Sequence, residues 1–210
     1  MLDFPTRHQT YEFPLDSIKL KSTRTGGRVD TNIVQLTKWR AFWHVDRCWW
    51  KDPTTLARGW TRQDDADWRW CGKVRRLRKN PWTRCAGLQV PGKDTRFQGA
   101  IIYRRDGQSL LEDDKGALYV EYLAAAPFNR RGYVSNPAYL GVGEALLTLA
   151  IAHSYHWNLG GRVSLFSLPG ALDFYRKYKF RETDHVESGM IHCELEPGPA
   201  IEFLCDKGIL

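Results

Sequence analysis

The stretch NPAYLGVGEALLTLAIAHS, residues Asn136–Ser154, decides how this chain folds. It places Gly141 and Gly143 one residue apart in front of an apolar run. Apolar side chains recur in that run at helical spacing and on the other helix faces too, which predicts a well-buried helix. A glycine pair at such a helix start is explained either by a tight turn or by a phosphate approaching bare backbone.

The segments around this helix predict a mixed sheet. Arg84–Val90 and Phe97–Arg105 read as two strands around a PGKD turn, and Ala117–Ala126 reads as a long strand stopped by Pro127. The sequence after the helix predicts a buried strand at Gly161–Leu168, followed by a short helix in PGALDFYRKYKF that proline opens. Residues 190–197 and 200–204 (MIHCELEP and AIEFL) are expected to be closing strands.

The first part of the chain predicts one strand and two helices. Asp16–Arg24 alternates and predicts a strand, while Thr31–Val45 has apolar residues at helical spacing and a candidate N-cap at Thr31 or Asn32. The run from 64 to 80 predicts a second helix. Its expected ends carry the charges that suit a helix dipole, acidic at Asp64, Asp65 and Asp67 and basic at Arg75, Arg76, Arg78 and Lys79.

These elements follow the order β–α–α–β–β–β–α–β–α–β. Helices between single strands imply crossovers, whereas the middle strands form a meander. The sequence therefore predicts a single-domain α/β protein over residues 1–210, with a mixed sheet and flanking helices. No strong boundary is apparent near residue 95.

Charge is distributed unevenly. Residues 1–95 carry a net charge of +9 and residues 96–210 a net charge of −2, and eight of the nine tryptophans lie between Trp39 and Trp82. A basic, tryptophan-rich half is typical of a surface for nucleic acid or another polyanion. It is equally typical of a solvated face over an aromatic core, which is the reading that the spread of the charges favours.

Composition also limits the cellular location and the kinds of site that we expect. The chain has no apolar stretch of 18 residues, and its first residues lack the basic and apolar regions of a signal peptide, so we expect a cytoplasmic protein without membrane contact. Five cysteines without a CxxC pair make a disulfide framework or zinc site improbable. His153 and His156 lie three residues apart without an evident third ligand, and no metal site is expected.

The segment from Phe97 to Thr183 resembles the GCN5-related N-acetyltransferase (GNAT) superfamily. YLAAAP resembles the family's fourth strand, YLGVG its acyl-CoA pyrophosphate loop, GRVSLFSL its fifth strand and ALDFYRKYKF its Ala-x-x-x-Tyr-x-x-x-Gly-Phe helix end. Ala138 stands where the family has Gln or Arg, Leu168 where it often has Asn, and Lys179 where it has Gly. The segment between Arg130 and Gly141 is several residues longer than usual.

The resemblance implies a GNAT-like sheet with central splayed strands, and acetyl-CoA as co-substrate. Backbone near Leu123, Ala124 and Ala125 would bond the pantetheine arm and polarise the thioester carbonyl. Arg130 and Arg131 would reach the 3′-phosphate, unless they are an exposed loop pair. The pyrophosphate would face the backbone N–H groups of Leu140, Gly141, Val142, Gly143, Glu144 and Ala145.

The resemblance also implies two catalytic residues. An alkylamine is protonated at neutral pH, so a base must take its proton, and Glu121 on the long strand is the candidate. A paired or exposed strand carboxylate is the alternative interpretation of Glu121. Tyr175 stands at the family's tyrosine position and would protonate the departing CoA sulfur, although core packing of an aromatic side chain accounts for it as well.

The function predicted from these residues is transfer of an acetyl group from acetyl-CoA to an amine by direct attack. The acceptor is a small molecule, a protein amine or an aminoacyl-tRNA, with residues 1–95 on the acceptor side, 96–183 binding CoA and 184–210 closing the sheet. The alternative is a catalytically inactive module of this fold that binds nucleic acid or a protein. The oligomeric state does not follow from the sequence.

Overall fold

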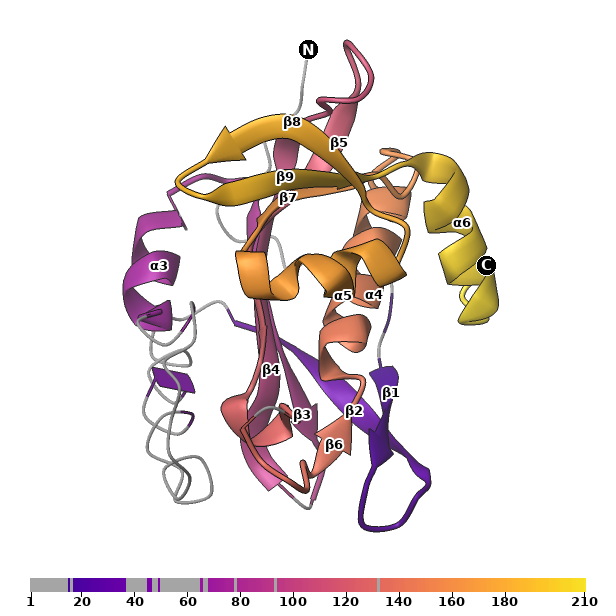
Figure 1. Cartoon of the computed structure of the whole chain (residues 1–210). Coiled ribbons are helices and arrows are strands. Elements are labelled where there is room, and N and C mark those ends of the chain that lie inside the picture. The colour runs from indigo at the N-terminus through magenta and orange to yellow at the C-terminus, as the bar shows by residue number, and fades with distance from the viewer. Residues whose placement is uncertain are drawn as a thin grey trace.

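The strands that the structure describes form one mixed sheet. The computed structural model describes residues 15, 17–36, 45–46, 49, 65, 68–77, 79–92, 94–131 and 133–210. Within these residues the sheet has the order β6-β1-β2-β3-β4-β5-β7-β9-β8. β5 and β7 pair in parallel and the other neighbours pair antiparallel. The predicted mixed α/β fold is therefore confirmed (Figure 1).

The bounds of the elements agree with most of the expected segments. The strands are β1 Ser17–Ser22, β2 Arg28–Gln35, β3 Thr83–Val90, β4 Asp94–Gln108, β5 Gly116–Ala125, β6 Tyr139–Leu140, β7 Val163–Ser167, β8 Arg181–Glu187 and β9 Met190–Leu195. The helices are α3 Trp70–Leu77, α4 Val142–His156, α5 Leu172–Lys177 and α6 Pro197–Asp206, with short 3-10 turns at Pro127–Asn129 and Pro169–Ala171.

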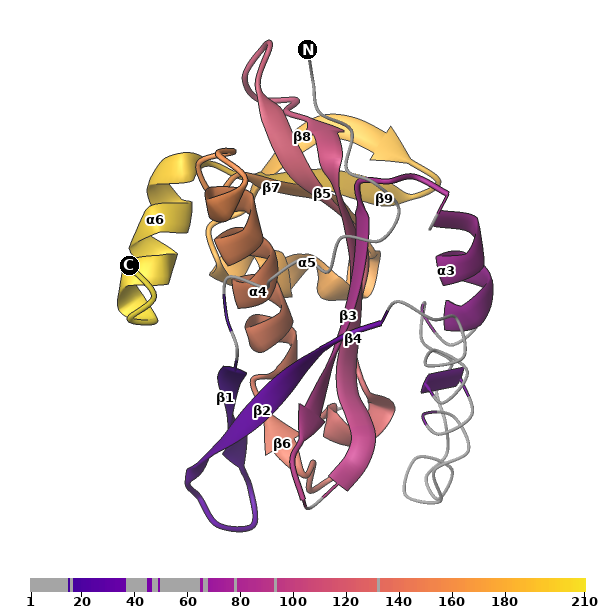
Figure 2. The same cartoon turned by 180° about the vertical axis from the view of Figure 1, so that it is seen from behind.

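Two apolar cores lie on the two faces of the sheet. The larger core joins β3, β4, β5 and β7 to α4 and α6, and includes Leu146, Leu149 and Val163. The smaller core lies on the opposite face, where Val74 of α3 packs with Ile102 of β4. Figures 1 and 2 show the sheet between α3 on one side and α4, α5 and α6 on the other.

The tryptophans that the structure describes in the basic half include core residues. Trp49 and Trp70 are fully buried, with ring centroids 5.6 Å apart, and the indole Nε1 of Trp49 donates a 2.9 Å hydrogen bond to the Phe97 carbonyl. These two rings fill the smaller core, as the aromatic-core interpretation expects. Trp39, Trp43, Trp50 and Trp60 lie outside the described residues.

The helix expected over Thr31–Val45 is wrong at its start, because Arg28–Gln35 forms strand β2. Val29 packs against one core and Val34 against the other, the two-residue alternation of a strand buried on both faces. Thr31 caps no helix, since its hydroxyl donates to the Ile18 carbonyl of β1. Residues 37–44 lie outside the described residues.

The second expected helix is shorter than predicted and is capped differently. α3 has no acidic residue in its first turn and carries Arg75 and Arg76 in its last. The Asp46 carboxylate accepts hydrogen bonds from the backbone N–H of Trp70 at 2.7 Å and of Cys71 at 3.0 Å. A carboxylate distant in sequence thus replaces the predicted local acids, of which Asp64 and Asp67 lie outside the described residues.

The C-terminal segment also departs from the prediction. Residues 200–204, expected as a closing strand, lie within α6, where Ala200 and Leu204 occupy one buried face at a spacing of four residues. Pro197 opens this helix at a position where its missing N–H costs no hydrogen bond. The closing pair is β8 with β9, and β8 was not predicted because it is exposed along almost its whole length.

A buried histidine makes the stability of the fold sensitive to acid. Burial, together with the charges of His156 and Arg84, lowers the pKa of His153 to about 3, whereas an unfolded histidine titrates near 6.5. Its stabilising contribution is therefore complete above about pH 6.5 and is lost as the pH falls toward 3. Urea unfolding at pH 7 and pH 5 should show that His153→Gln reduces the acid loss of stability by about 2 kcal/mol.

The exposed neighbour provides the control. His156→Gln should lose as much stability between these pH values as the wild type, because its ring stays in water. If His153→Gln lost as much stability between pH 7 and pH 5 as the wild type does, other groups would be responsible for the acid sensitivity.

Candidate active site

The parallel strands β5 and β7 separate halfway along β5. Their last paired residues are Val120 and Leu165, and in the part of the chain that the structure describes no later residue of β5 pairs with β7. The register of β5 against β4 shifts here, because Val120 faces Tyr103 while Tyr122 faces Ile102. Glu121 is therefore an extra residue in β5, and such a bulge bends and twists the strand. This confirms the expected central splay.

α4 begins beside the open end of this splay. Gly141 is its N-cap residue and has a positive φ of 81°, and no side chain caps the first turn in the described structure. A Cβ added at Gly141 would meet nothing within 4 Å, whereas one at Gly143 would lie 3.2 Å from Phe174 of α5. Gly141 is thus required by its left-handed backbone conformation, and Gly143 by the close packing of Phe174. The N–H groups of the first turn remain available to an anion.

The loop before α4 is fixed by the first hairpin. Its last two residues, Tyr139 and Leu140, form β6, which pairs with Ser22 and Lys21 of β1. The Thr23 hydroxyl donates a 2.6 Å hydrogen bond to the Pro137 carbonyl. The residues that lengthen this segment therefore add an edge strand, which holds the glycine loop against the N-terminal hairpin.

Glu144 lies in the first turn of α4 with its charge neutralised. Its carboxylate accepts a 2.7 Å hydrogen bond from the Tyr178 hydroxyl and forms an ion pair with Lys207 at the end of α6. Burial opposes ionisation of Glu144, but the hydrogen bonds from Lys207 and Tyr178 outweigh it and lower the pKa of the carboxyl. The acid therefore connects α4 to the C-terminal segment without presenting a bare negative charge to the glycine loop.

Glu121 and Tyr175 come from opposite sides of the sheet. Arg104 faces Tyr119 across the β4–β5 ladder, and its Nε donates a 2.9 Å hydrogen bond to Glu121 Oε1. Tyr103, which precedes Arg104 in β4, belongs to the core on the α4 side. Consecutive strand residues point to opposite faces, so Arg104 and the Glu121 carboxylate that it binds lie on the α3 side. Tyr175 of α5 packs into the core on the α4 side. The gap between β5 and β7 therefore has Glu121 on the α3 face of the sheet and Tyr175 on the α4 face.

Tyr175 is held as a neutral phenol. Only 7% of the residue is exposed, and its ring makes edge contacts with Phe174 and Phe180. Burial raises the pKa of Tyr175 far above neutrality, and the neighbouring Cys193 raises it further. The hydroxyl therefore keeps its proton at neutral pH and can donate it, while the ring also packs as the alternative interpretation expects.

The helix that carries Tyr175 ends in a left-handed residue. Lys179, which stands where the family has glycine, has a φ of 63°. Its side chain leaves the turn and pairs with Glu202 of α6, with 2.6 Å between Nζ and Oε2. A helix end tolerates this conformation, as expected from the sequence.

The three residues proposed for the pantetheine arm differ in their surroundings. Leu123 and Ala125 are half-buried against the core beside α4, whereas Ala124 is buried in the core beside α3. All three follow the splay point, so no strand of the described structure pairs with them on the β7 side. The carbonyl of Ala125 accepts a 2.8 Å hydrogen bond from the Nε of Arg130.

Arg130 is committed to structural contacts and Arg131 is not. Both terminal nitrogens of the Arg130 guanidinium donate hydrogen bonds to the Asp65 carboxylate, and the distance from Nη1 to Oδ1 is 2.8 Å. It thereby links the end of β5 to the basic half of the chain. Arg131 is exposed in the following turn. With its charge already compensated by Asp65, Arg130 is a poor ligand for a phosphate, contrary to the role that the resemblance implied.

The Arg130–Asp65 pair should behave as one unit. Arg130→Gln and Asp65→Asn should each destabilise the protein by about 3 kcal/mol, because each leaves a mostly buried charge without its partner. The double variant should cost little more than either single one, which urea unfolding of all four proteins measures. Arg131→Gln, one residue away and exposed, should change stability by less than about 0.5 kcal/mol. Strictly additive losses would exclude the pairing.

Sequence reasoning missed three residues that shape the site. Arg104 binds Glu121, Asp65 binds Arg130, and Lys21 faces Leu140 beside the glycine loop. For Lys21, the alternating pattern of Asp16–Arg24 predicted its place in a strand, but no pattern in the sequence indicated the partners of the three residues. Within the described residues, no group of three His, Cys, Asp or Glu side chains could hold a metal ion. None of the described helices has the length and apolar character that a bilayer crossing requires.

Comparison with known proteins identifies the fold. No family model and no curated protein matches the sequence. Among solved structures, a mutant of the AtaT toxin bound to the C-terminus of the antitoxin AtaR and acetyl-CoA is 13% identical, with a TM-score of 0.55 over 83% of this chain and 98% of its own.

Two further solved structures show the same likeness. FeeM, an N-acyl amino acid synthase from uncultured soil microbes, is 14% identical, with a TM-score of 0.52 over 84% of this chain and 96% of its own. An acetyltransferase of the GNAT family from Staphylococcus aureus is 15% identical, with a TM-score of 0.51 over 80% and 99%. This chain therefore has the fold of the GNAT acetyltransferases, as its sequence indicates.

Proposed function

We propose that this protein is an N-acetyltransferase that moves an acetyl group from acetyl-CoA to an amine. The observation that carries the proposal is the opening of the sheet between β5 and β7 beside the uncapped start of α4. Unpaired strand backbone can bond an extended amide chain, and the helix N-terminus can hold a phosphate. The solved structures of this fold include acetyl-CoA complexes, which supports the same co-substrate here.

The residues present fit this co-substrate. N–H groups from Leu140 to Glu144 would face the pyrophosphate, and Gly141 leaves open space above the loop. Ala145, also expected there, is excluded because its N–H donates a 2.9 Å hydrogen bond to the Gly141 carbonyl. Backbone groups of Leu123 and the N–H of Ala125 would bond the pantetheine arm, and Arg130 would hold the Ala125 carbonyl in place. Ala124, also expected to bond the arm, turns its backbone toward β4, as the 3.1 Å approach of its carbonyl oxygen to the Cβ position of Gly99 indicates. Acetyl-CoA supplies a thioester, and a backbone N–H of this strand would polarise its carbonyl as the amine attacks.

Glu121 and Tyr175 would handle the protons. The amine must lose a proton to become a nucleophile, and Glu121 would accept it directly or through a water, with Arg104 fixing the carboxylate from the α3 side. The C–S bond of the thioester then breaks and the sulfur needs a proton or a hydrogen bond. Tyr175, buried and neutral on the opposite side, would donate it.

The acceptor would enter from the α3 side, where Glu121 lies. Small amines, protein amines and aminoacyl-tRNA remain the candidate acceptors, and the basic half of the chain would form part of their site. Contact with nucleic acid through that half stays a prediction. So does the cytoplasmic location.

Binding of acetyl-CoA is the first test. At roughly 100 times its dissociation constant, the ligand should stabilise the native state by about 2.7 kcal/mol, which thermal unfolding would report as a clear upward shift. Gly141→Asn should lose that shift, because asparagine tolerates the left-handed conformation while its side chain enters the space above the loop.

A second left-handed glycine gives the matched control. Gly189 in the β8–β9 turn has a φ of 78° and equally open surroundings, so Gly189→Asn should keep the acetyl-CoA shift. Absence of any shift with acetyl-CoA or CoA in the wild type would remove the transferase proposal and favour the inactive binding module.

The catalytic assignments predict separable defects. Tyr175→Phe should lower kcat for acetyl transfer about 100-fold with acetyl-CoA binding unchanged, since only the donated proton is lost. Glu121→Gln should lower kcat/KM, because the amide cannot accept the proton from the amine. Steady-state kinetics with a screened amine acceptor would measure both. A Tyr178→Phe variant should keep kcat, and an equal fall there would point to general damage of α5.

A further inference from the structure

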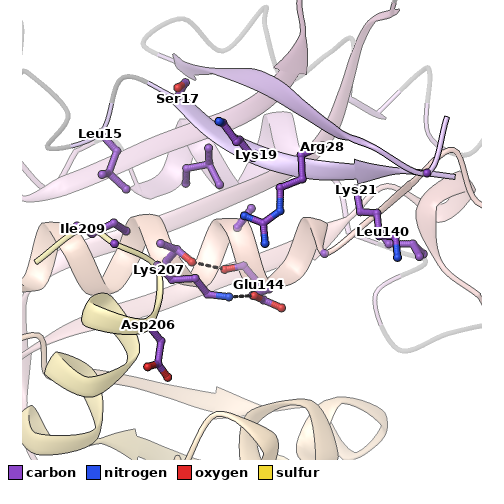
Figure 3. Close-up of a pocket in the computed structure, with 16 residues that line it drawn as sticks. Leu15, Ser17, Lys19, Lys21, Arg28, Leu140, Glu144, Asp206, Lys207 and Ile209 are labelled. Atoms are coloured by element: carbon purple, nitrogen blue, oxygen red, sulfur yellow. Dashed lines mark hydrogen bonds and ion pairs between the residues drawn. The ribbon is translucent and has the colours of Figure 1, made fainter.

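A cavity that includes the glycine loop extends along the first hairpin. It is open to solvent and has a volume of about 1030 Å³ between β1, the first turn of α4 and the chain after α6. Its lining includes Lys19, Lys21, Arg28 and Lys207, against two acids, Glu144 and Asp206. Figure 3 shows the Arg28 side chain extending from β2 toward α4, and Lys21 beside Leu140.

The positive charge of this cavity is only partly compensated. Lys207 is bound by Glu144, as described above. Among the described residues, Lys21 and Arg28 form no ion pair with an acidic side chain, and Lys19 forms none either. Asp30 stands opposite Lys19 in the ladder but does not line the cavity. The hairpin side of the cavity therefore carries an excess of exposed cationic side chains, of which Arg28 extends toward α4 and Lys21 lies beside Leu140 (Figure 3).

The two strands bring like charges together. Lys21 of β1 and Arg28 of β2 are direct cross-strand partners in the antiparallel ladder. Opposed residues of this kind have Cβ atoms roughly 5 Å apart, and like charges there destabilise a sheet. An anion bound between the two side chains would remove this repulsion, whereas folding alone gains nothing from the pair.

The position of Lys21 connects the cavity to the proposed pyrophosphate loop. Lys21 pairs with Leu140, the residue immediately before Gly141. Leu140, Gly141 and Glu144 belong both to that loop and to the cavity lining. A ligand that places a diphosphate on the loop therefore has its next phosphate within reach of the hairpin. Of the two residues expected to bind that phosphate, Arg130 is occupied by Asp65, whereas Arg131 is exposed in the following turn and does not line the cavity.

We propose that this cavity binds the 3′-phosphorylated adenosine end of acetyl-CoA, with Lys21 and Arg28 as the ligands of its phosphomonoester. The inference rests on the proposed function and names the residues that distinguish CoA from dephospho-CoA. A phosphomonoester carries close to two negative charges at neutral pH and offers three acceptor oxygens. A guanidinium beside an ammonium supplies the donors for such a group.

Calorimetric titration with CoA and with dephospho-CoA tests the assignment. The wild type should bind CoA about tenfold or more tightly than dephospho-CoA, the value of a good charge-assisted contact. Lys21→Gln and Arg28→Gln should each reduce this preference severalfold, and the double variant should abolish it. The affinity for dephospho-CoA should stay within about twofold throughout, because the loop N–H groups are unchanged.

Two controls accompany the variants. Arg24→Gln removes an exposed cation from the turn of the same hairpin, outside the cavity lining, and should keep the wild-type preference. The ligand-free Lys21→Gln protein should unfold at a temperature no lower than the wild type, since relief of a like-charge pair does not destabilise the sheet. A substitution that merely damaged the fold would lower that temperature and weaken both ligands equally.

The possible failures are distinct. Equal affinity of the wild type for CoA and dephospho-CoA would overturn this inference and leave the proposed function standing. Binding of neither compound would overturn the proposed function, and the inference with it. Adenosine 3′,5′-bisphosphate should compete with CoA. Its binding without competition would mark an independent anion site and overturn the assignment to CoA.

Discussion

The parallel pairing of β5 with β7 stops at Val120 and Leu165, and the backbone groups beyond that point need partners other than a neighbouring strand. The rest of the candidate site follows from this constraint. The bulge at Glu121 turns a carboxylate toward the α3 side at the same place, and α4 begins next to the opening. A ligand with amide groups and phosphates can satisfy the exposed strand and the helix N-terminus together.

The protein secures this opening with contacts between distant segments. Arg130 joins the last carbonyl of β5 to Asp65 of the basic half, and the first hairpin holds the glycine loop through β6. Glu144 connects α4 to the end of α6. Each connection leaves a local charge or backbone group satisfied, so the splayed strands keep their geometry without pairing to each other.

Charge is arranged differently on the two sides of the glycine loop. The acid within the loop helix is neutralised by Lys207, whereas Lys21 and Arg28 of the hairpin stand opposite each other and form no ion pair with an acidic side chain of the described residues. A repulsive cross-strand pair is unfavourable to folding, and binding sites are where proteins retain such local costs. This contrast is the physical basis for placing the charged end of the co-substrate beside the hairpin.

Local patterns are enough to predict the strands from β3 to β5, β7, the buried helix behind Gly141 and a mixed α/β sheet, because periodicity and turn residues are local. The splay was expected only from the resemblance of residues 97–183 to the GNAT superfamily. Local patterns failed at β2, where apolar spacing fits a helix and a buried strand alike, and at residues 200–204, where one buried face of a helix resembled a strand. Only the tertiary structure decided that Asp65 takes Arg130, that Asp46 caps α3 and that Lys21 faces both Arg28 and Leu140. Those partners are far apart in the chain or set by strand register, and no local pattern encodes which distant side chain arrives.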